Sequence, residues 1–300
     1  MNYKSERLVN GDTLAPIFIN GQFRTRTTWW FTQFRKLSQC MCFYTPLTPI
    51  LVDHTPLEAS VLFQGSKCLR HEETYDYYQE YPGYPNKMVK TARDWSTHSY
   101  FMDPDSEDIE MERHFQYLID YAQKRGKIPV FKLNWGLMRG TWLKSHFGGT
   151  HLYITRDPLS LRRSFDSFRG SLSWAWRDLI MIVGQNQDHP LMRPVTKMLK
   201  YRQPEGVLDY KEARHYASQF CRSGKLNFTQ EMKLKLITYF QKLGDSDAKY
   251  YADYSIGDIN NVKKVERDIR ALTNLPIDLS NYKTKKIAKK DDPVHVSPKH

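Results

Sequence analysis

The side chains of this chain best suited to chemistry are the cationic and hydroxyl-bearing residues of one short run, Arg24-Thr25-Arg26-Thr27-Thr28. The guanidinium of Arg24 is a planar donor that matches the oxygens of a phosphate-type anion, and the threonine hydroxyl groups add further donors. The run is not the loop of the nucleoside triphosphatases, because the pattern G-x-x-x-x-G-K-[ST] does not occur. These residue types therefore predict an anion site.

The elements expected around this run would bring its donors together. An apolar strand over 16–20 leads into a tight turn at Gly21, and a helix is expected to run through Phe31, Phe34 and Leu37. A loop between a strand end and a helix N-terminus directs several backbone N–H groups at one point, where the helix dipole favours negative charge. The predicted loop is therefore a cradle for an anion.

A second segment carries a related pattern further along the chain. An apolar strand over 151–155 is followed by Arg156, Asp157 and Pro158, and Ser164 comes eight residues after the arginine. Asp157 is a good helix N-cap and Pro158 a good first helical residue, so a helix should begin directly at the strand's carboxyl end. In parallel α/β sheets ligands bind at that edge. We therefore expect Arg156 on the same edge as the first loop.

The first loop resembles the 5′-phosphosulfate loop of sulfotransferases, which runs roughly P-x-[RK]-S-G-T-[TS]-[WL] after a first strand. Arg24 matches the basic residue of that family, Thr25 its serine, and Thr27 and Thr28 its pair of hydroxyl residues. The resemblance implies that these residues bind the 5′-phosphate end of 3′-phosphoadenosine 5′-phosphosulfate (PAPS). One position departs from the family, because Arg26 stands where its loop has glycine, which tolerates unusual backbone angles.

The second segment extends the resemblance, which covers residues 16–168. Sulfotransferases hold the 3′-phosphate of PAPS with an arginine before [DN]-Pro and a serine eight residues later, the spacing of Arg156 and Ser164. The resemblance also implies that Trp29 stacks on the adenine and that Lys132 lies near the sulfuryl group. It points to bacterial and carbohydrate-modifying members more than to the cytosolic aryl type, and it implies no metal.

The catalytic base is the part of the family pattern that this sequence lacks. The histidine of cytosolic members falls on Asn134, which cannot accept a proton from a hydroxyl group at useful pH. The late R-K-G-x-x-G signature of those members is also missing. Of the acids and histidines expected near the acceptor, we prefer His54 or Glu72 and assign His54 to catalysis. The full set of candidates is His54, Glu58, His71, Glu72 and Glu73.

The order of the expected elements predicts an α/β fold. Apolar strands over 41–44, 128–133 and 151–155 alternate with helices, which favours a parallel sheet, of P-loop-like topology, covered by helices on both faces. Beyond Pro158 the chain should be almost wholly helical. We expect a helical pattern at 51–63 that is interrupted by Pro56, and helices at 109–122, 137–143, 158–169, 171–184, 190–201, 209–222, 228–243 and 258–272, with loops at Gly206, Gly224 and Gly244. Residues 1–282 would form one domain, and 283–300 a basic flexible tail.

The irregular stretch 65–104 contains many aromatic residues, which suit either a sugar-binding surface or a packing layer of tyrosines. Both interpretations remain open from the sequence. The aromatic residues concerned are Tyr75, Tyr77, Tyr78, Tyr81, Tyr84, Trp95, Tyr100 and Phe101.

The overall composition describes a globular, basic protein. Hydrophobic residues make up 40% of the chain and the formal net charge is +12, so anionic partners are favoured. The four cysteines lack paired metal-ligand spacing, and neither a signal peptide nor a long apolar segment is evident. We therefore expect a cytoplasmic protein without a transmembrane segment.

The resemblance implies a sulfotransferase that moves a sulfuryl group from PAPS to a hydroxyl or amine, on a carbohydrate or small metabolite. No nucleic acid is expected as a partner, and the oligomeric state is left open. Two alternatives remain. One is a non-catalytic basic module that binds nucleic acid or acidic glycan. The other is a nucleotide kinase-like enzyme, which would need a P-loop lysine and a magnesium-binding aspartate that are not in place.

Overall fold

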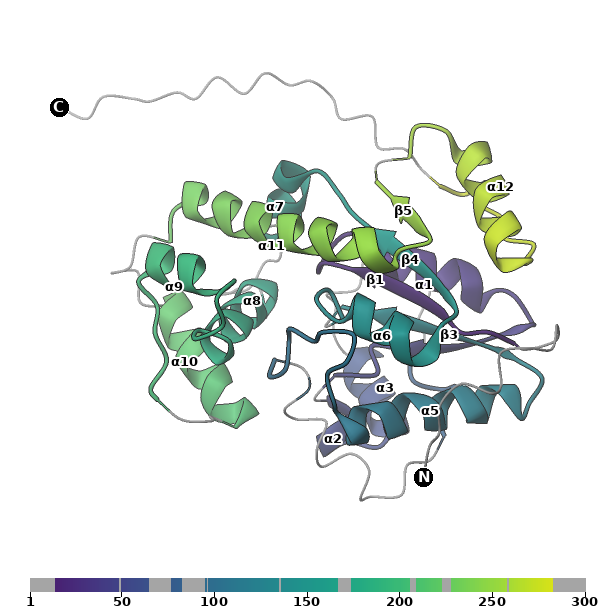
Figure 1. The fold of residues 1–300 in the computed structure, drawn as a ribbon, viewed down its shortest axis with the longest axis horizontal. Helices are drawn as coiled ribbons and strands as arrows, with labels where there is room; N and C mark the ends of the chain where they lie inside the picture. The colour runs from purple at the N-terminus through teal and green to yellow at the C-terminus, as the bar shows by residue number, and fades with distance from the viewer. Residues whose placement is uncertain are drawn as a thin grey trace.

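The computed structural model contains one sheet of five parallel strands surrounded by helices (Figure 1). It describes residues 14–48, 50–64, 77–82, 95, 97–134, 136–166, 174–205, 209–222, 228–257 and 259–282. The strands are β1 (Ile17–Gly21), β2 (Cys40–Tyr44), β3 (Ile128–Leu133), β4 (Thr150–Ile154) and β5 (Tyr254–Ile256). The helices are α1 (Thr27–Arg35), α2 (Ile50–Asp53), α3 (Pro56–Gln64), α5 (Ile109–Gln123), α6 (Gly140–Phe147), α7 (Pro158–Asp166), α8 (Trp174–Gln185), α9 (Arg193–Leu199), α10 (Tyr210–Arg222), α11 (Gln230–Tyr251) and α12 (Val262–Thr273).

The strand order β2-β3-β1-β4-β5 puts β1 in the centre of the sheet. Ile17 pairs with Val130 of β3 on one side and with Thr150 of β4 on the other. Because all strands run in the same direction, the loops that follow β1, β3 and β4 leave the sheet at one edge. This carboxyl edge is where the predicted site residues should meet.

Helices cover both faces of the sheet, as predicted. Phe43 stacks on Phe131 with 5.3 Å between ring centroids, and Phe131 contacts Phe115 of α5. The next residue of β2, Tyr44, contacts Phe31 of α1 at 5.4 Å. Successive side chains of a strand point to opposite faces, so α5 and α1 lie on opposite sides of the sheet. The predicted parallel α/β fold is confirmed.

The C-terminal half is largely helical, and Figure 1 shows α8, α9 and α10 gathered beside the sheet with α11 running from them towards β5. Two predictions fail here. The strand β5 was not expected, and Gly244 lies inside α11 and not in a loop. A Cβ atom at Gly244 would come within 2.6 Å of Leu137 Cδ1 and 2.8 Å of the Tyr153 hydroxyl oxygen. Glycine is therefore used for close packing of α11 on α6 and β4.

Two other helix boundaries show which local signals determine them. The helical pattern predicted over 51–63 divides at Pro56, which begins α3 after the short helix α2. Asp105 and Ser106 are residue types that cap helices, yet α5 begins only at Ile109. Its N-cap is Asp108, whose carboxylate accepts from the backbone N–H of Met111 at 2.9 Å. Capping by the residue nearest the first buried position explains the later start.

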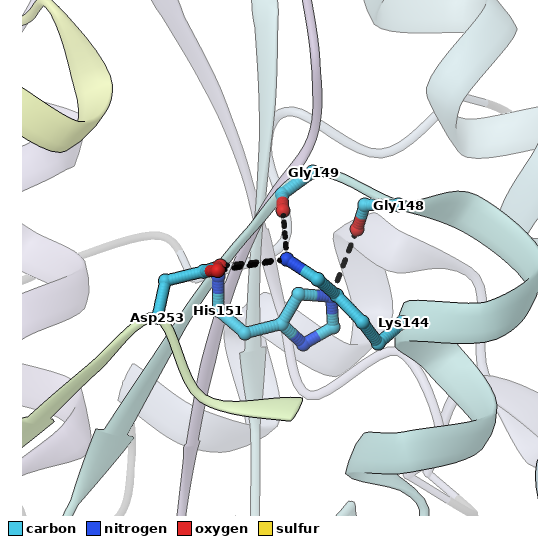
Figure 2. A network of polar contacts seen from close by, with 5 residues as sticks. All are labelled: Lys144, Gly148, Gly149, His151 and Asp253. Carbon is cyan, nitrogen blue, oxygen red and sulfur yellow. Dashed lines mark hydrogen bonds and ion pairs between the residues drawn. The ribbon is translucent and has the colours of Figure 1, made fainter. Parts of the chain in front are cut away.

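The amino end of β4 is held by a network of polar contacts (Figure 2). The Lys144 ammonium donates to Gly149 O at 2.8 Å and lies within 2.9 Å of both carboxylate oxygens of Asp253. The same carboxylate accepts from the backbone N–H of His151 at 2.8 Å, and the His151 ring donates from Nε2 to Gly148 O at 2.9 Å. This edge of the sheet is thus closed by charge pairing and hydrogen bonds.

After α12 the chain returns along the molecule to the first loop. The side chains of Ile277 and Leu279 are completely buried, and they belong to the same hydrophobic core as β1. The prediction of a single domain over 1–282 stays a prediction. The expected tail at 283–300 lies outside the described residues. None of the helices in the described part of the chain has the length and apolar character needed to cross a membrane.

Candidate functional site

The loop between β1 and α1 is a tight turn with unusual backbone angles. Gln22 O accepts from both the backbone N–H of Thr25, at 3.3 Å, and its hydroxyl group, at 2.7 Å. Arg24 and Arg26 have φ values of 69° and 75°, in the left-handed region. Residues other than glycine seldom adopt this conformation, which costs about 1–3 kcal/mol each and concentrates at functional sites.

Gly21 is required by close approach where β1 enters the loop. A Cβ atom there would lie 2.7 Å from Ile154 O of β4 and 2.7 Å from the Thr25 hydroxyl oxygen. The absence of a side chain lets the loop fold back against the end of β4. The predicted turn at Gly21 is therefore what brings the first loop close to the second segment.

The two predicted anion motifs meet at Arg24. Its Nε donates to the hydroxyl oxygen of Ser164 at 3.2 Å, and its backbone oxygen accepts from Arg156 at 3.3 Å. These residues are 140 and 132 positions apart in sequence. The fold therefore brings Arg24, Arg156 and Ser164 together at the carboxyl edge.

The local sequence of the second segment explains why Ser164 reaches this edge. Asp157 accepts from the backbone N–H of Ser160 at 2.7 Å, as an N-cap does, and α7 begins at Pro158. Arg156 consequently lies at the junction between β4 and α7. Ser164 follows on the same helix and faces the loop after β1.

The N-terminus of α1 carries no side-chain cap from its N-cap residue, Arg26, and its first turn contains no acidic residue. The first N–H groups of a helix have no partner within the helix. Because the helix dipole places partial positive charge at the same point, a phosphate-type group would be stabilised there.

The threonines of the loop fix its shape. The Thr25 hydroxyl closes the turn on Gln22 O, and the Thr27 hydroxyl donates to the side-chain oxygen of Asn134 at 3.2 Å. The Thr28 hydroxyl forms a hydrogen bond with the Tyr44 hydroxyl. Asn134, which stands where cytosolic sulfotransferases have their histidine, therefore contacts the loop directly.

Lys132 is buried beside the loop, where the resemblance places it. Its ammonium nitrogen lies 4.1 Å from the ring centroid of Tyr44, and only 1% of the residue is exposed. Burial lowers the pKa of Lys132 well below its ordinary range, and the positive charge of Arg24 lowers it further. Burial also raises the pKa of Tyr44, which Arg24 partly offsets. The site thus concentrates like charge, a frequent property of functional sites.

Trp29 and Arg26 both contact Tyr282, near the C-terminus of the described chain. Arg26 donates from its guanidinium to the Tyr282 hydroxyl, and the guanidinium carbon lies 5.3 Å from the ring centroid. The Trp29 and Tyr282 rings meet edge to face at 5.0 Å, and Trp29 meets Trp30 in the same way at 5.1 Å. Trp29 is half-buried, so part of its indole remains exposed for stacking.

The carboxyl end of β1 carries two amide side chains that sequence analysis missed. The side-chain nitrogen and oxygen of Asn20 and of Gln22 are buried without a hydrogen-bond partner among the residues that the structure describes. Buried polar groups without partners cost about 1–3 kcal/mol each. The sequence could have indicated these two amides, because polar residues stand on either side of Gly21 at the end of an otherwise apolar strand.

None of the candidates for the catalytic base contacts Arg24 among the residues that the structure describes, and three of them lie outside those residues. His54 follows α2, where its backbone N–H donates to Ile50 O, and its ring lies near Glu58. Glu58 forms a capping box with Thr55 at the start of α3, with 2.7 Å from its carboxylate to the Thr55 N–H. The structure brings neither residue into the contacts around Arg24. His71, Glu72 and Glu73 lie outside the described residues.

Most of the described aromatic residues of the irregular stretch are buried and form a packing layer, so the alternative of a sugar-binding surface is wrong for these buried residues. The rings of Tyr44, Tyr77, Tyr78 and Tyr81 contact one another next to β2. The buried members are Tyr77, Tyr78, Tyr81, Trp95 and Tyr100. Phe101 is half-buried and stacks on His189, and Tyr75 and Tyr84 lie outside the described residues.

Arg139 explains how part of this irregular stretch is held. Its guanidinium is completely buried and donates to the backbone oxygens of Trp95, His98 and Ser99 at 2.5–2.8 Å. Burial lowers the pKa of Arg139 to about 10, which still keeps it charged at neutral pH. A single cation thus binds the carbonyl groups of three residues of this stretch.

The geometry assembles a loop with left-handed residues, the N-terminus of α1, two arginines, a buried lysine and a serine hydroxyl at one edge of the sheet. Such a set can bind a ligand carrying two anionic groups and neutralise charge that develops between them. Comparison of the chain with protein-family models, curated proteins and solved structures gives no significant match.

Proposed function

We propose that this chain is a PAPS-dependent sulfotransferase. The observation that carries the proposal is the direct contact of Arg24 with both Ser164 and Arg156. A nucleotide with phosphate groups on its 3′ and 5′ oxygens presents two anions on one ribose ring. Two basic sites that meet at one edge suit such a ligand better than a single phosphate.

In this proposal the chain binds PAPS through its loop and its second segment. The loop N–H groups and Thr25 to Thr28 hold the 5′-phosphate, Arg156 and Ser164 hold the 3′-phosphate, and Trp29 provides a face for the adenine. The cytoplasm is the proposed location. The acceptor is a hydroxyl or amine on a carbohydrate or small metabolite.

The reaction transfers the sulfuryl group from the 5′-phosphate oxygen to the acceptor oxygen or nitrogen. A bond forms from the acceptor to sulfur, the bond from sulfur to the phosphate oxygen breaks, and the acceptor proton leaves to a base. In this proposal Arg24 and Lys132 neutralise charge on the bridging oxygen and the sulfuryl oxygens, as cations do in phosphoryl transfer. The proposed base, His54, rests on sequence alone. A His54→Ala variant with activity within about threefold of wild type would remove it from the mechanism.

Thermal denaturation with matched nucleotides tests the proposal. Adenosine 3′,5′-bisphosphate should stabilise the protein, by about 2.7 kcal/mol when its concentration is 100 times its Kd. Adenosine 5′-monophosphate, which lacks the 3′-phosphate, should stabilise it much less. Arg156→Ala and Ser164→Ala should remove the difference between the two nucleotides. No response to the bisphosphate would contradict the proposal, and a response to ATP with magnesium alone would favour a kinase-like enzyme.

A second candidate function is a basic module that binds an anionic polymer without chemistry. Asn134 at the position of the family's histidine, together with the net charge of +12, favours this alternative. Such binding should weaken steeply as salt rises, because counterions are released from the polymer. Tight, salt-sensitive binding of DNA or RNA, without a response to the bisphosphate, would establish it.

A further inference from the structure

The last described segment of the chain is fixed against α12 before it reaches the loop. Arg270 donates to Ile277 O at 3.0 and 2.9 Å, and the backbone N–H of Leu279 donates to Glu266 at 3.2 Å. Ile277 and Leu279 are completely buried. These contacts position Tyr282, which is far from the loop after β1 in sequence, next to that loop.

Tyr282 contacts both sides of the junction between the loop and α1. Its hydroxyl accepts from the guanidinium of Arg26, whose carbon is 5.3 Å from the tyrosine ring centroid. Its ring meets Trp29, in the first turn of α1, at 5.0 Å. The tyrosine is thus bound to the residue that precedes the helix and to a residue within it.

Arg26 is the residue of the loop that most needs such a partner. It is the N-cap of α1, has φ 75°, and makes no capping hydrogen bond with its side chain. The Cβ atom of an L-residue clashes with the following carbonyl oxygen in this conformation, a cost that glycine avoids. Residues in strained conformations persist only where surrounding contacts hold them.

We propose that Tyr282 is a positioning residue that holds Arg26 in the left-handed conformation, so that the loop keeps its shape without a glycine. The guanidinium is held through the tyrosine hydroxyl and ring, and the loop N–H groups stay directed at the anion site. The consequence for ligands rests on the proposed function, since it assumes that the loop binds the 5′-phosphate. The hold itself does not depend on any ligand.

A double-mutant cycle of Tyr282→Phe with Arg26→Gly tests the hold. Tyr282→Phe keeps the ring beside Trp29 and removes only the hydroxyl that accepts from Arg26. In the wild-type background we expect it to lower the Tm of the ligand-free protein by about 2 °C. In the Arg26→Gly background, where glycine needs no partner, we expect no change. An equal Tm change in both backgrounds, or none in either, would overturn the proposal.

Arg26→Ala provides the matched control for the loss of the arginine side chain. Arg26→Ala and Arg26→Gly both lose the contact with Tyr282, but only alanine retains a Cβ atom in the left-handed conformation. We therefore expect Arg26→Gly to melt about 2 °C above Arg26→Ala. If Arg26→Ala is as stable as Arg26→Gly, then the left-handed conformation at residue 26 does not need a stabilising contact.

Calorimetric titration with adenosine 3′,5′-bisphosphate extends the test to the ligand. Tyr282→Phe should weaken binding by about three- to tenfold in the wild-type background and leave binding unchanged in the Arg26→Gly background. The Tm cycle could show coupling between Tyr282 and Arg26 while neither the wild-type protein nor any variant binds the bisphosphate. In that case the positioning role of Tyr282 stands and the proposed function fails. If the wild-type protein binds the bisphosphate and Tyr282→Phe binds it with the same affinity, then the contact between Tyr282 and Arg26 does not affect ligand binding. That result would overturn the part of the proposal that concerns the ligand.

Discussion

Residues with positive φ angles occur at both ends of the central sheet, at very different cost. Before β4, at the amino end, Gly148 and Gly149 have φ of 59° and 74°. At the carboxyl end, Arg24 and Arg26 have φ of 69° and 75°. Glycine adopts positive φ angles without strain, whereas arginine does not. Of these two pairs, only the arginines beside the candidate site therefore carry strain.

The distribution of charge differs in the same way. At the amino end, Lys144 pairs with Asp253 at 2.8 Å. At the carboxyl end, Lys132 is buried beside the positive charge of Arg24, and both lie near Tyr44. One end is neutralised within the protein and the other gathers like charges. This difference supports the proposal that the carboxyl end binds an anionic ligand, and the following measurements can break or sharpen the comparison.

The largest expected effect follows from removal of Arg24. Arg24→Ala should lower kcat/KM for sulfuryl transfer by about 100-fold or more, because a cation aimed at developing charge is lost. Lys144→Ala, at the amino end, should leave activity unchanged and lower stability slightly, by about 1 kcal/mol or less for a partly exposed pair. Steady-state kinetics and urea unfolding measure both effects. Near-normal turnover of a folded Arg24→Ala variant would end the assignment.

Substitution of glycine at the amino end should cost stability without affecting the site. A Cβ atom at Gly149 would lie 2.2 Å from Pro16 O, and the residue has φ +74°. We expect Gly149→Ala to lower the free energy of unfolding by about 3 kcal/mol. Gly126→Ala is the matched control, because Gly126 has φ +66° but no atom within 4 Å of the added Cβ. Gly126→Ala should lower the free energy of unfolding by only about 1 kcal/mol. An equal decrease in the two variants would show that contact with Pro16 is unimportant.

The pH dependence of stability should report on His151 at the amino end. Burial lowers the pKa of its imidazole from 6.5 to about 4, so between these values the unfolded chain binds a proton that the folded protein does not. Stability is therefore complete above pH 6.5 and falls as the pH approaches 4. In His151→Gln the free energy of unfolding should fall less over this pH range, by up to about 3 kcal/mol. Urea unfolding across this range measures it, and parallel pH profiles would contradict the expectation.

At the carboxyl end, protonation should instead be coupled to ligand binding. The pKa of Lys132 is lowered in the free protein, and an anionic ligand beside it should raise that pKa. Between the lower and the higher pKa, binding of adenosine 3′,5′-bisphosphate should take up as much as one proton. Below the lower pKa it should take up none. Calorimetry in buffers of different ionisation enthalpy measures this uptake, and Lys132→Met should abolish it. Equal uptake in the variant would assign the proton to another group.

Much of the fold was predictable because its signals are local. The apolar runs that became β1, β3 and β4, and the Asp157-Pro158 start of α7, identify themselves in the sequence. The strand β5 does not, because three residues are too few for a periodic pattern and its identity comes from pairing with β4. Tertiary packing likewise carries α11 through Gly244.

The candidate site was predictable only in part, for a similar reason. Spacing in the sequence indicated that Arg156 and Ser164 would meet the first loop, and they do. Nothing near Arg26 indicates that Tyr282, 256 residues later, contacts it. The left-handed angles of Arg24 and Arg26 were also unexpected, since arginine has no preference for them. Contacts between distant segments decide both features.

The brevity of β5 has a consequence for the behaviour of the protein in concentrated solution. An edge strand exposes unpaired backbone groups to which a second chain could add a strand, and long, flat edges promote aggregation. At this edge only Tyr254, Ser255 and Ile256 continue the sheet, and α12 follows after a short connection, tied back by the Tyr254 hydroxyl bond to Asp268. The sheet therefore ends in a strand too short to template further growth.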